Sequence, residues 1–300
     1  MVAMPGLMLL DTPSLYYRAF YGIPESMTSP GGMPVNAVRG VIGMIAMLVR
    51  RYSPHELVAC MDADWRPAFR VAAIPTYKTH RVAEGGAEET PDTLAPQVPV
   101  IEQVLDAVGI TRIGVPGYEA DDVMGTLTAR ASGQVDVVTG DRDLFQLVDD
   151  SRPVRVLYTA RGVKNLQLVD EAAVAEKYGI PGRSYADFAT LRGDPSDGLP
   201  GVPGVGDKTA AALITRFGSL EALLRAVDGD GDLTSGQRAR LSAARDYLRV
   251  APEVVRVARD APLPEADLTL PAKPRDPAAL AALSECYGLG GPLERLTSTL

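Results

Sequence analysis

Residues 7–11 read Leu-Met-Leu-Leu-Asp, an apolar run that ends on an acid. Three later stretches repeat this arrangement: Leu57–Met61 before Asp62, Ile110–Val115 before Glu119, and Val135–Val138 before Asp141. Short apolar runs bounded by turn residues are typical of buried parallel strands. In open parallel sheets the ligand lies beyond the carboxyl ends of the strands. The sequence therefore predicts that these acids converge at one edge of a parallel sheet.

More acids follow the same runs or a later loop, namely Asp121, Asp122, Asp143, Asp194 and Asp197. Two carboxylates about 5 Å apart, at an effective dielectric constant of about 20, repel each other by about 3 kcal/mol. Acids in a first helical turn can simply complement the helix dipole, but three acids within residues 119–122 exceed what capping requires. Carboxylate oxygens are ligands that Mg²⁺ and Mn²⁺ prefer. The cluster therefore predicts a divalent-metal site.

The chain has 300 residues and a net charge of −8, which at first argues against a nucleic-acid partner. The charges are separated along the sequence, however. One basic run holds Arg66, Arg70, Lys78, His80 and Arg81, and a second, which is more simply a solvated helix face, holds Arg238, Arg240, Arg245 and Arg249. No apolar stretch approaches the length needed to cross a bilayer, so we expect no membrane association and a cytoplasmic, nucleoid-associated protein.

The pattern of elements predicts an α/β fold with a mostly parallel central sheet and flanking helices. A helix is expected over Val35–Arg51, where apolar residues recur at helical spacing. We expect an α/β core over residues 1–180, interrupted by an insertion at about 66–99 that is helical in part, and an all-helical region over 181–300. The Pro-rich stretch Ala261–Arg275 is expected to be irregular.

The stretch Gly201–Ala210 reads Gly-Val-Pro-Gly-Val-Gly-Asp-Lys-Thr-Ala. A Gly-rich turn that opens a helix at about Asp207 presents backbone N–H groups to a phosphate, with Lys208 beside it. An ordinary connection between two helices is the alternative interpretation. Phosphate binding is favoured because the turn directly follows the acids Asp194 and Asp197.

Six motifs occur in an order that resembles a known family. They are residues 9–20 around Asp11, residues 61–70 around Asp62, Tyr77–Arg81, Gly117–Asp122, Thr139–Leu144 and Gly193–Gly201. From Leu7 to about Phe217 the chain is similar to the 5′ nuclease domain of bacterial DNA polymerase I and its stand-alone relatives, the flap endonuclease family. The resemblance implies a PIN-like core, a helical arch over the insertion and a helix-three-turn-helix with its hairpin element at about 193–217. One departure is Gly198, where the family usually has Asn.

The resemblance also implies roles for particular residues. A first metal ion would lie among Asp11, Asp62, Glu119 and Asp121, and a second near Asp141, Asp143 and Asp197, with Asp122 and Asp194 as direct or water-mediated ligands. Lys78 and Arg81 would grip the scissile phosphate as catalytic residues. DNA phosphates would contact Arg18, Arg70, Gly204, Gly206 and Lys208, although a salt bridge to the acids is an alternative role for Arg70. The backbone carbonyls of Val202 and Val205 would bind K⁺.

The function implied is that of a structure-specific 5′ nuclease, with 5′-3′ exonuclease and flap endonuclease activity, that acts in primer removal and repair. Its partners would be branched or 5′-ended duplex DNA and RNA–DNA primer junctions, with a DNA polymerase or sliding clamp as candidate protein partners, and it would act as a monomer. Two alternatives stay open. A PIN-type ribonuclease shares the acid-tipped core but is usually smaller and lacks Gly201–Gly206, and a DNA-binding module without catalysis would not need every expected acid.

Overall fold

The computed structural model describes residues 6–229 and 231–300, which form a six-stranded sheet of order β3-β2-β1-β4-β5-β6. Neighbouring strands from β3 to β5 are parallel, and β6 is antiparallel to β5. The strands are β1 (Leu7–Asp11), β2 (Glu56–Cys60), β3 (Thr111–Ile113), β4 (Val135–Thr139), β5 (Val154–Tyr158) and β6 (Gln167–Val169). The prediction of a mostly parallel sheet is confirmed, and the four acid-tipped runs are β1 to β4.

Helices cover the sheet and extend from it. Those in the first part of the chain are α1 (Thr12–Gly22), α2 (Asn36–Tyr52), α3 (Ala68–Ala73), α4 (Gln97–Val108), α5 (Ala120–Arg130) and α6 (Glu171–Tyr178). The later ones are α7 (Tyr185–Arg192), α8 (Asp207–Phe217), α9 (Leu220–Asp228), α10 (Ser235–Ala243), α11 (Arg245–Val255), α12 (Pro277–Tyr287) and α13 (Gly290–Thr297). The helix predicted over 35–51 is α2. Among residues 6–229 and 231–300, no helix is both long and apolar enough to span a bilayer.

The two faces of the sheet bury separate apolar clusters, as the alternation of side chains along β1 illustrates. Leu7 and Leu9 face a cluster that includes α5 and α7, whereas Met8 and Leu10 face one formed with α1, α2 and α4. Every residue of β1 is buried, as expected for a strand covered on both faces. The burial of both faces explains why β1 reads as a continuous apolar run and not as an alternating one.

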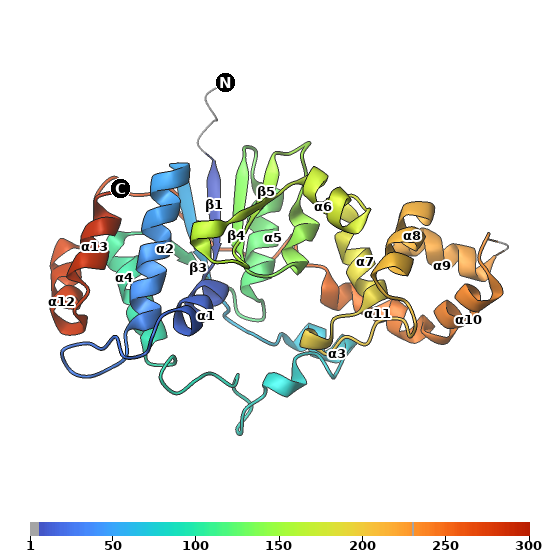
Figure 1. The fold of residues 1–300 in the computed structure, drawn as a ribbon, viewed down its shortest axis with the longest axis horizontal. Coiled ribbons are helices and arrows are strands. Elements are labelled where there is room, and N and C mark those ends of the chain that lie inside the picture. The colour runs from blue at the N-terminus through green and yellow to red at the C-terminus, as the bar shows by residue number, and fades with distance from the viewer. Residues whose placement is uncertain (1–5, 230) are drawn as a thin grey trace.

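The insertion lies beneath the carboxyl ends of the strands in Figure 1. Its regular structure consists of α3 and a single 3₁₀ turn over Thr79–Arg81. The remainder up to Pro96 is irregular, with an antiparallel bridge between Val82 and Glu88 that closes a turn at Gly85 and Gly86. The insertion is therefore helical in part, as expected, and its glycines and prolines keep the helical segments short.

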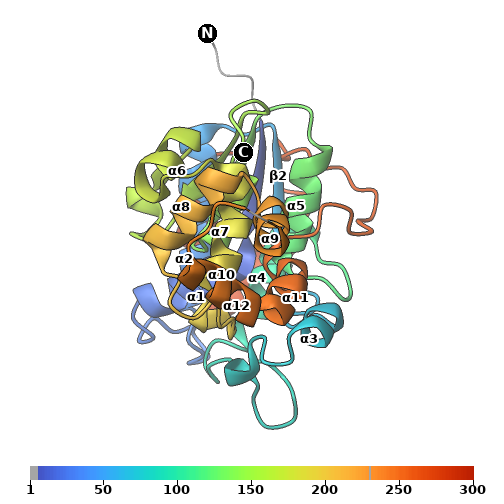
Figure 2. The same cartoon turned by 90° about the vertical axis from the view of Figure 1, so that its right-hand side faces the viewer.

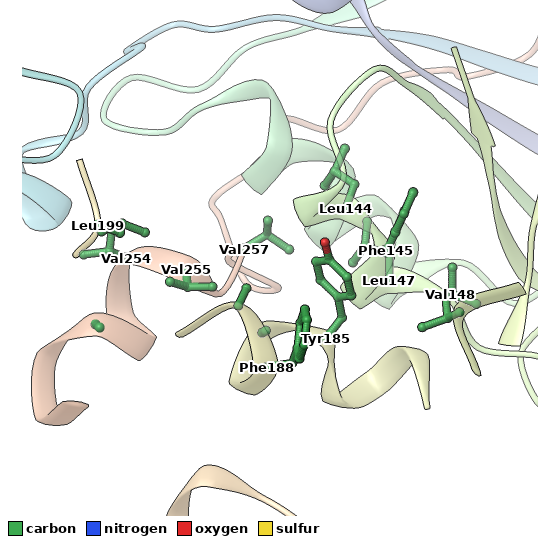
Figure 3. Close-up of a cluster of buried hydrophobic side chains, with 14 of the residues drawn as sticks. Leu144, Phe145, Leu147, Val148, Tyr185, Phe188, Leu199, Val254, Val255 and Val257 are labelled. Atoms are coloured by element: carbon green, nitrogen blue, oxygen red, sulfur yellow. The ribbon is translucent and has the colours of Figure 1, made fainter. Parts of the chain in front are cut away.

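Helices α7 to α11 form a lobe beside the sheet, and Figure 2 views the molecule from this end. The lobe is joined to the core by an apolar cluster drawn in Figure 3, whose labelled members are Leu144, Phe145, Leu147, Val148, Tyr185, Phe188, Leu199, Val254, Val255 and Val257. Phe145 lies in the 3₁₀ turn Asp143–Leu147, and its ring centroid is 5.5 Å from that of Tyr185 in α7. The lobe thus packs directly behind the acid motif at the end of β4.

The last two helices do not join that lobe. α12 and α13 return to the α/β core, where Leu280, Leu283, Leu293 and Leu296 pack in the same cluster as α2 and α4 (Figure 1). The single helical region expected over 181–300 is therefore divided between two places. The irregular stretch expected over 261–275 connects them, and it pairs with the start of β2 through bonds from Leu57 N to Leu268 O and from Leu270 N to His55 O, each 2.9 Å.

The close crossing of α1 and α2 generates the first prediction. A Cβ at Gly40 would lie 2.5 Å from the Cβ of Ala19, whereas one at Gly43 in the same helix meets nothing within 4 Å. We expect Gly40→Ala to lower the free energy of unfolding by about 1–3 kcal/mol through overpacking. Gly43→Ala should raise it by up to about 1 kcal/mol through helix propensity. Urea unfolding of both variants checks this, and equal effects would contradict it.

Candidate active site at the carboxyl edge of the sheet

The strand ends that carry the acids meet at the place where the order of the strands in the sheet reverses. From β1 the strand order runs through β2 and β3 on one side and through β4 and β5 on the other, which makes the β1–β4 border the topological switch point. A cleft of about 470 Å³ opens at this edge. Of the residues predicted for the site, its lining includes Asp11, Asp62, Lys78, Arg81, Glu119, Asp121, Asp141 and Asp194.

Asp11 ties the two central strands together. It caps α1 by accepting a bond from Ser14 N to its Oδ1 (3.1 Å), and its Oδ2 accepts a bond from the hydroxyl of Thr139 at the end of β4 (2.6 Å). The same hydroxyl accepts the backbone N–H of Asp141 at 2.8 Å. Thr139 therefore orients two acids, a role that its place in the Thr-Gly-Asp motif after a strand could have suggested.

Glu119 is buried among three donors. Its carboxylate accepts bonds from Lys78 Nζ (2.6 Å), the hydroxyl of Tyr77 (2.9 Å) and Arg70 Nη1 (2.9 Å). Burial by itself lowers the pKa of Lys78, but the charge of Glu119 more than offsets this and holds that pKa well above its ordinary value. Lys78 also adopts a left-handed backbone conformation with φ of 49°. Such a conformation in a non-glycine residue needs tertiary contacts to hold it.

Asp62 and Asp121 complete the side of the cleft next to Glu119. Asp62 accepts a bond from the backbone N–H of Ala120 at 2.7 Å, so it contributes to the start of α5. Asp62 is open to solvent on its cleft side, yet the protein packed behind it and the charge of Glu119 raise the pKa of its carboxyl to about 7. Burial, followed by the charge of Asp11, raises the pKa of Asp121 well above its ordinary value.

The other side of the cleft holds the acids that follow β4 and α7. Asp141 accepts the backbone N–H of Asp143 at 2.8 Å, and one buried oxygen of Asp143, Oδ1, has no hydrogen-bond partner. Asp197 pairs with Arg81 at 2.9 Å, and burial raises the pKa of Asp197 to about 6. Asp194 accepts the backbone N–H of Ser196 at 2.9 Å. These acids lie on the same side of the cleft, but Asp141 and Asp194 each accept a hydrogen bond from a different local turn.

The chemistry of this cluster fits divalent cations. Burial raises the pKa of Asp11 to about 6 and that of Asp143 well above its ordinary value. The hydrogen bonds and positive charges around these two carboxylates therefore do not fully offset the cost of burying their negative charge. The unpartnered oxygen of Asp143 is a further donor for a hard cation. Within residues 6–229 and 231–300, no three His, Cys, Asp or Glu side chains stand close enough to form a ready-made metal group. In this arrangement the chain's own cations, Lys78 and Arg81, bind two of the carboxylates.

Two of the residues predicted for the site lie behind it. Two roles were open for Arg70, contact with DNA phosphates or a salt bridge to the acids, and its side chain is 2% exposed and paired with Asp122 and Glu119, which agrees with the salt bridge. Asp122 was expected near the metal, but it is fully buried, and its two oxygens accept bonds from Arg70, from Ala258 N and from Glu119 N. Both residues face the rear of the site because the guanidinium draws the Asp122 carboxylate away from the cleft.

The glycine-rich loop precedes α8 as predicted. Gly206 is the N-cap of α8, and Gly204 is exposed with φ of 76°. The Lys208 side chain is exposed in the first turn of this helix, and Arg240 of α10 approaches the loop by donating to the carbonyl of Gly204. The side chains of Val202 and Val205 are buried beneath, and the carbonyl of Val202 accepts the N–H of Val205 at 2.9 Å.

Several residues at the cleft were not anticipated from the sequence. Tyr17, Glu88, Arg142 and Tyr158 line it, and Arg142 stands between the two acids of its motif, which is the signal that could have indicated it. Arg18, which was predicted, is half-buried near Gly140 and donates to the carbonyl of Ala160 at 3.3 Å.

Gly198, the departure from the resembling family, has a structural reason. Its φ is 74°, and a Cβ there would lie 2.3 Å from the carbonyl oxygen of Thr76 in the insertion. The hydroxyl of Thr76 in turn donates to the carbonyl of Gly198 at 3.1 Å. Glycine at this position therefore lets the insertion pack closely against the loop that carries Asp197.

Two family descriptions match consecutive parts of the chain. The first, 5′-3′ exonuclease, N-terminal resolvase-like domain, covers residues 6–179, and the second, 5′-3′ exonuclease, C-terminal SAM fold, covers residues 180–278. The chain belongs to the 5′-3′ exonuclease family. The resemblance drawn from the motifs is thereby confirmed, and it extends beyond Phe217, where the motifs ended.

Curated relatives agree with this assignment. A 5′-3′ exonuclease of Streptomyces coelicolor is 63% identical over 299 residues, which cover 98% of this chain and 99% of the relative. A 5′-3′ exonuclease of Mycobacterium tuberculosis is 49% identical, with coverage of 98% and 97%. The DNA polymerase I of the same organism is 44% identical over 280 residues, but only 29% of the polymerase is covered.

Solved structures of low sequence identity share the fold. The bacteriophage T5 D15 protein, co-crystallised with metal ions, has a TM-score of 0.65 at 18% identity, and the match covers 83% of this chain and 89% of that one. Human GEN1 in complex with Holliday junction DNA has a TM-score of 0.64 at 16% identity, with coverage of 98% and 72%. At these identities the likeness establishes the architecture alone.

The raised pKa values generate a prediction on stability. The pKa of buried Asp11 is about 6 in the folded protein, above the ordinary value of 3.8. Between these pH values the folded state binds more protons than the unfolded state, so the free energy of unfolding falls as pH rises from about 4 to about 6. We expect this fall in EDTA, a shallower fall for Asp11→Asn, and partial recovery on adding Mg²⁺ at neutral pH. Urea unfolding across this range measures it, and identical slopes in parent and variant would refute it.

Proposed function

We propose that this chain is a structure-specific 5′ nuclease that hydrolyses a phosphodiester near the 5′ end or flap of duplex DNA. The observation that carries the proposal is the joining of two features in one chain of the 5′-3′ exonuclease family. A cluster of poorly compensated carboxylates lies at the switch point of the sheet, and a helix-opening glycine loop lies on the adjoining lobe. The first suits phosphodiester hydrolysis, and the second suits binding of a phosphate backbone.

Two or more divalent ions, Mg²⁺ or Mn²⁺, are the proposed cofactors. When bound at such a site, they supply an activated water and stabilise the leaving oxygen. The residues proposed to hold them are Asp11, Asp62, Glu119, Asp121, Asp141, Asp143, Asp194 and Asp197. Support comes from the raised pKa values of Asp11, Asp62, Asp121, Asp143 and Asp197, since a group of carboxylates that resists ionisation is stabilised by cations.

Lys78 and Arg81 are the proposed catalytic cations. Each comes from the insertion, and each is paired with one acid of the cluster. A scissile phosphodiester at the cleft carries one negative charge, as each carboxylate does, and gains more in the transition state, so we infer that these cations exchange Glu119 and Asp197 for the phosphate. The exchange would release two carboxylates for metal and place positive charge where it develops during the reaction.

The duplex arm is proposed to bind at the α7–α8 loop. The backbone N–H groups around Gly204 and Gly206 would contact phosphates, with Lys208 as a nearby positive charge. The proposed K⁺ ion at the carbonyls of Val202 and Val205 would stiffen the loop. Arg18, at the β1–β4 border, is proposed to contact a further phosphate.

The biological task we propose is removal of RNA primers and displaced flaps in replication and repair. It agrees with the similarity to part of DNA polymerase I, whose remaining length this chain does not cover. The substrates would be branched or 5′-ended DNA and primer junctions. We further propose that the protein is a monomer that acts with a polymerase or sliding clamp. Its proposed location is cytoplasmic and nucleoid-associated. The two alternatives are not favoured, because the family match spans both the core and the helical part.

Asp143 provides the direct test of metal-dependent cleavage. We expect Asp143→Asn to reduce the single-turnover rate on a labelled 5′-flap duplex by several orders of magnitude, because a lost metal ligand removes several kcal/mol of transition-state stabilisation. Flap affinity should change little. Asp246→Asn, at an exposed position in α11, is the matched control and should behave as the parent.

The reactions are run with Mg²⁺, with Mn²⁺ and with EDTA and resolved on a denaturing gel. Cleavage by the parent in either metal and none in EDTA supports the proposal. If Asp143→Asn cleaves within tenfold of the parent, the assignment of this acid is wrong. If the parent cuts an unstructured RNA better than the flap duplex, the ribonuclease alternative replaces the proposed function.

The loop before α8 makes a separate prediction. Lys208→Ala should weaken binding to flap duplex and reduce the log–log salt dependence by about 0.9 for each lost phosphate contact. Gly204→Pro should weaken it further, because proline cannot adopt the positive φ of this position. Neither change should affect the weaker binding of a matching single strand. Fluorescence anisotropy at several salt concentrations tests this, and equal losses on both substrates would mean that the loop is only a connector.

A further inference from the structure

Arg70 is a buried cation that comes from the insertion but contacts two other parts of the chain, the start of α5 and the end of α11. Its guanidinium donates four hydrogen bonds: from Nε to the carbonyl of Val254, from Nη1 to both Glu119 and Asp122, and from Nη2 to Asp122. The distances lie between 2.6 and 3.0 Å. The side chain is only 2% exposed, so no phosphate can reach it in this arrangement.

We propose that Arg70 is a positioning residue that fixes Glu119 in the acid cluster and couples the cluster to the insertion and the helical lobe. The proposal rests on the proposed function, since Glu119 is one of the suggested metal ligands. It builds on the salt bridge to the acids, which was one of the two roles left open for Arg70. It also gives Asp122 a role, because this carboxylate accepts from both Nη1 and Nη2 and so holds the guanidinium in place.

The charges of this network explain why Glu119 needs a second cation. Arg70 and Lys78 together face Glu119 and Asp122, which gives two positive and two negative charges in a buried region. Lys78 is half-buried and borders the cleft, so it can turn toward a phosphate. Arg70 cannot. When Lys78 leaves, the bond from Arg70 still restrains the carboxylate of Glu119, because the two bonds to Asp122 hold the guanidinium in one position.

The same residues join the site to the helical lobe. The carbonyl of Val254, which accepts from Arg70, lies in the last turn of α11. Asp122 accepts the backbone N–H of Ala258 just beyond that helix at 2.8 Å. α11 packs against α7, whose C-terminus leads into the loop proposed to hold duplex DNA. Arg70 therefore fixes the distance between the proposed metal ligands and the proposed duplex-binding surface.

Arg70→Lys tests the proposal, because lysine keeps the charge but cannot make the forked contact. Loss of an orienting contact behind a metal ligand typically costs about 10–100-fold in metal affinity or activity. We expect losses in this range both in Mn²⁺ binding, followed by electron paramagnetic resonance without DNA, and in the single-turnover rate on a 5′-flap duplex. Flap affinity in EDTA should stay within about twofold of the parent's, since phosphate contacts are untouched.

The matched control is Arg155→Lys, which alters another forked Arg–Asp pair, with Asp136 on β4, away from the cleft. It should leave Mn²⁺ binding and rate unchanged. The double variant Arg70→Met/Asp122→Leu replaces the buried pair by apolar groups of similar size, which often preserves stability. We expect it to fold, as judged by its thermal transition, and still to bind Mn²⁺ weakly.

Two outcomes would overturn the proposal. If flap affinity in Arg70→Lys falls as steeply as the rate while Mn²⁺ binding is unchanged, Arg70 contacts DNA after all. If the double variant regains the parent's Mn²⁺ affinity and rate, the pair only stabilises the fold. Failure of the proposed function is a different result: the parent itself would then bind Mn²⁺ without cleaving the flap.

Discussion

Electrostatic repulsion at the carboxyl edge of the sheet is the constraint on which the rest of this structure depends. The strands β1, β2 and β4 and the helix α5 bring their acids to one border, and burial there raises the pKa of several of them. Such an edge is stable only if cations and N–H donors reach it. The insertion supplies the cations Arg70, Lys78 and Arg81, while backbone N–H groups and the Thr139 hydroxyl supply the rest. The insertion is therefore held in place by the acids it neutralises.

This mutual dependence explains why a glycine-rich and proline-rich segment has a defined course next to the site. Lys78 keeps a left-handed conformation that costs about 1–3 kcal/mol on its own. Its backbone N–H donates to the carbonyl of Asp197 at 3.0 Å, and its ammonium group is bound to Glu119, so both ends of the residue are restrained. Between Arg81 and Gln97 there is no helix or strand, and the chain is held by turns such as the bond from Glu89 N to the carbonyl of Arg81 at 2.7 Å. The part of the insertion that contacts the acids is thus the part that contains its regular structure.

The sequence could predict the sheet and the gathering of acids, because apolar runs that end on acids specify both the strand type and the edge at which side chains emerge. It could not predict which acids face the cleft. Asp121 and Asp122 are neighbours in one helical turn, yet only Asp121 lines the cleft, because the side chains of adjacent helical residues diverge by about 100°. The partner that draws Asp122 inward, Arg70, lies about fifty residues earlier in the chain. The sequence also could not predict that α12 and α13 pack against the core. Their apolar stripes show that one face is buried but do not show which helix covers it.

The net charge of −8 is compatible with binding to a nucleic acid. Screening limits exposed charges to an influence of about 10 Å at 0.1 M salt, so a distant acid has little effect on a phosphate at the lobe. Within the second basic run, Arg238 is used to bind the carbonyls at the end of α9, and Arg245 is paired with Asp228. Arg240 differs, because it lies beside Gly204 at the glycine loop. Two arginines of this run are thus engaged within the chain, and a third stands at the glycine loop, so affinity for a phosphate backbone depends on where a few cations stand and not on their total.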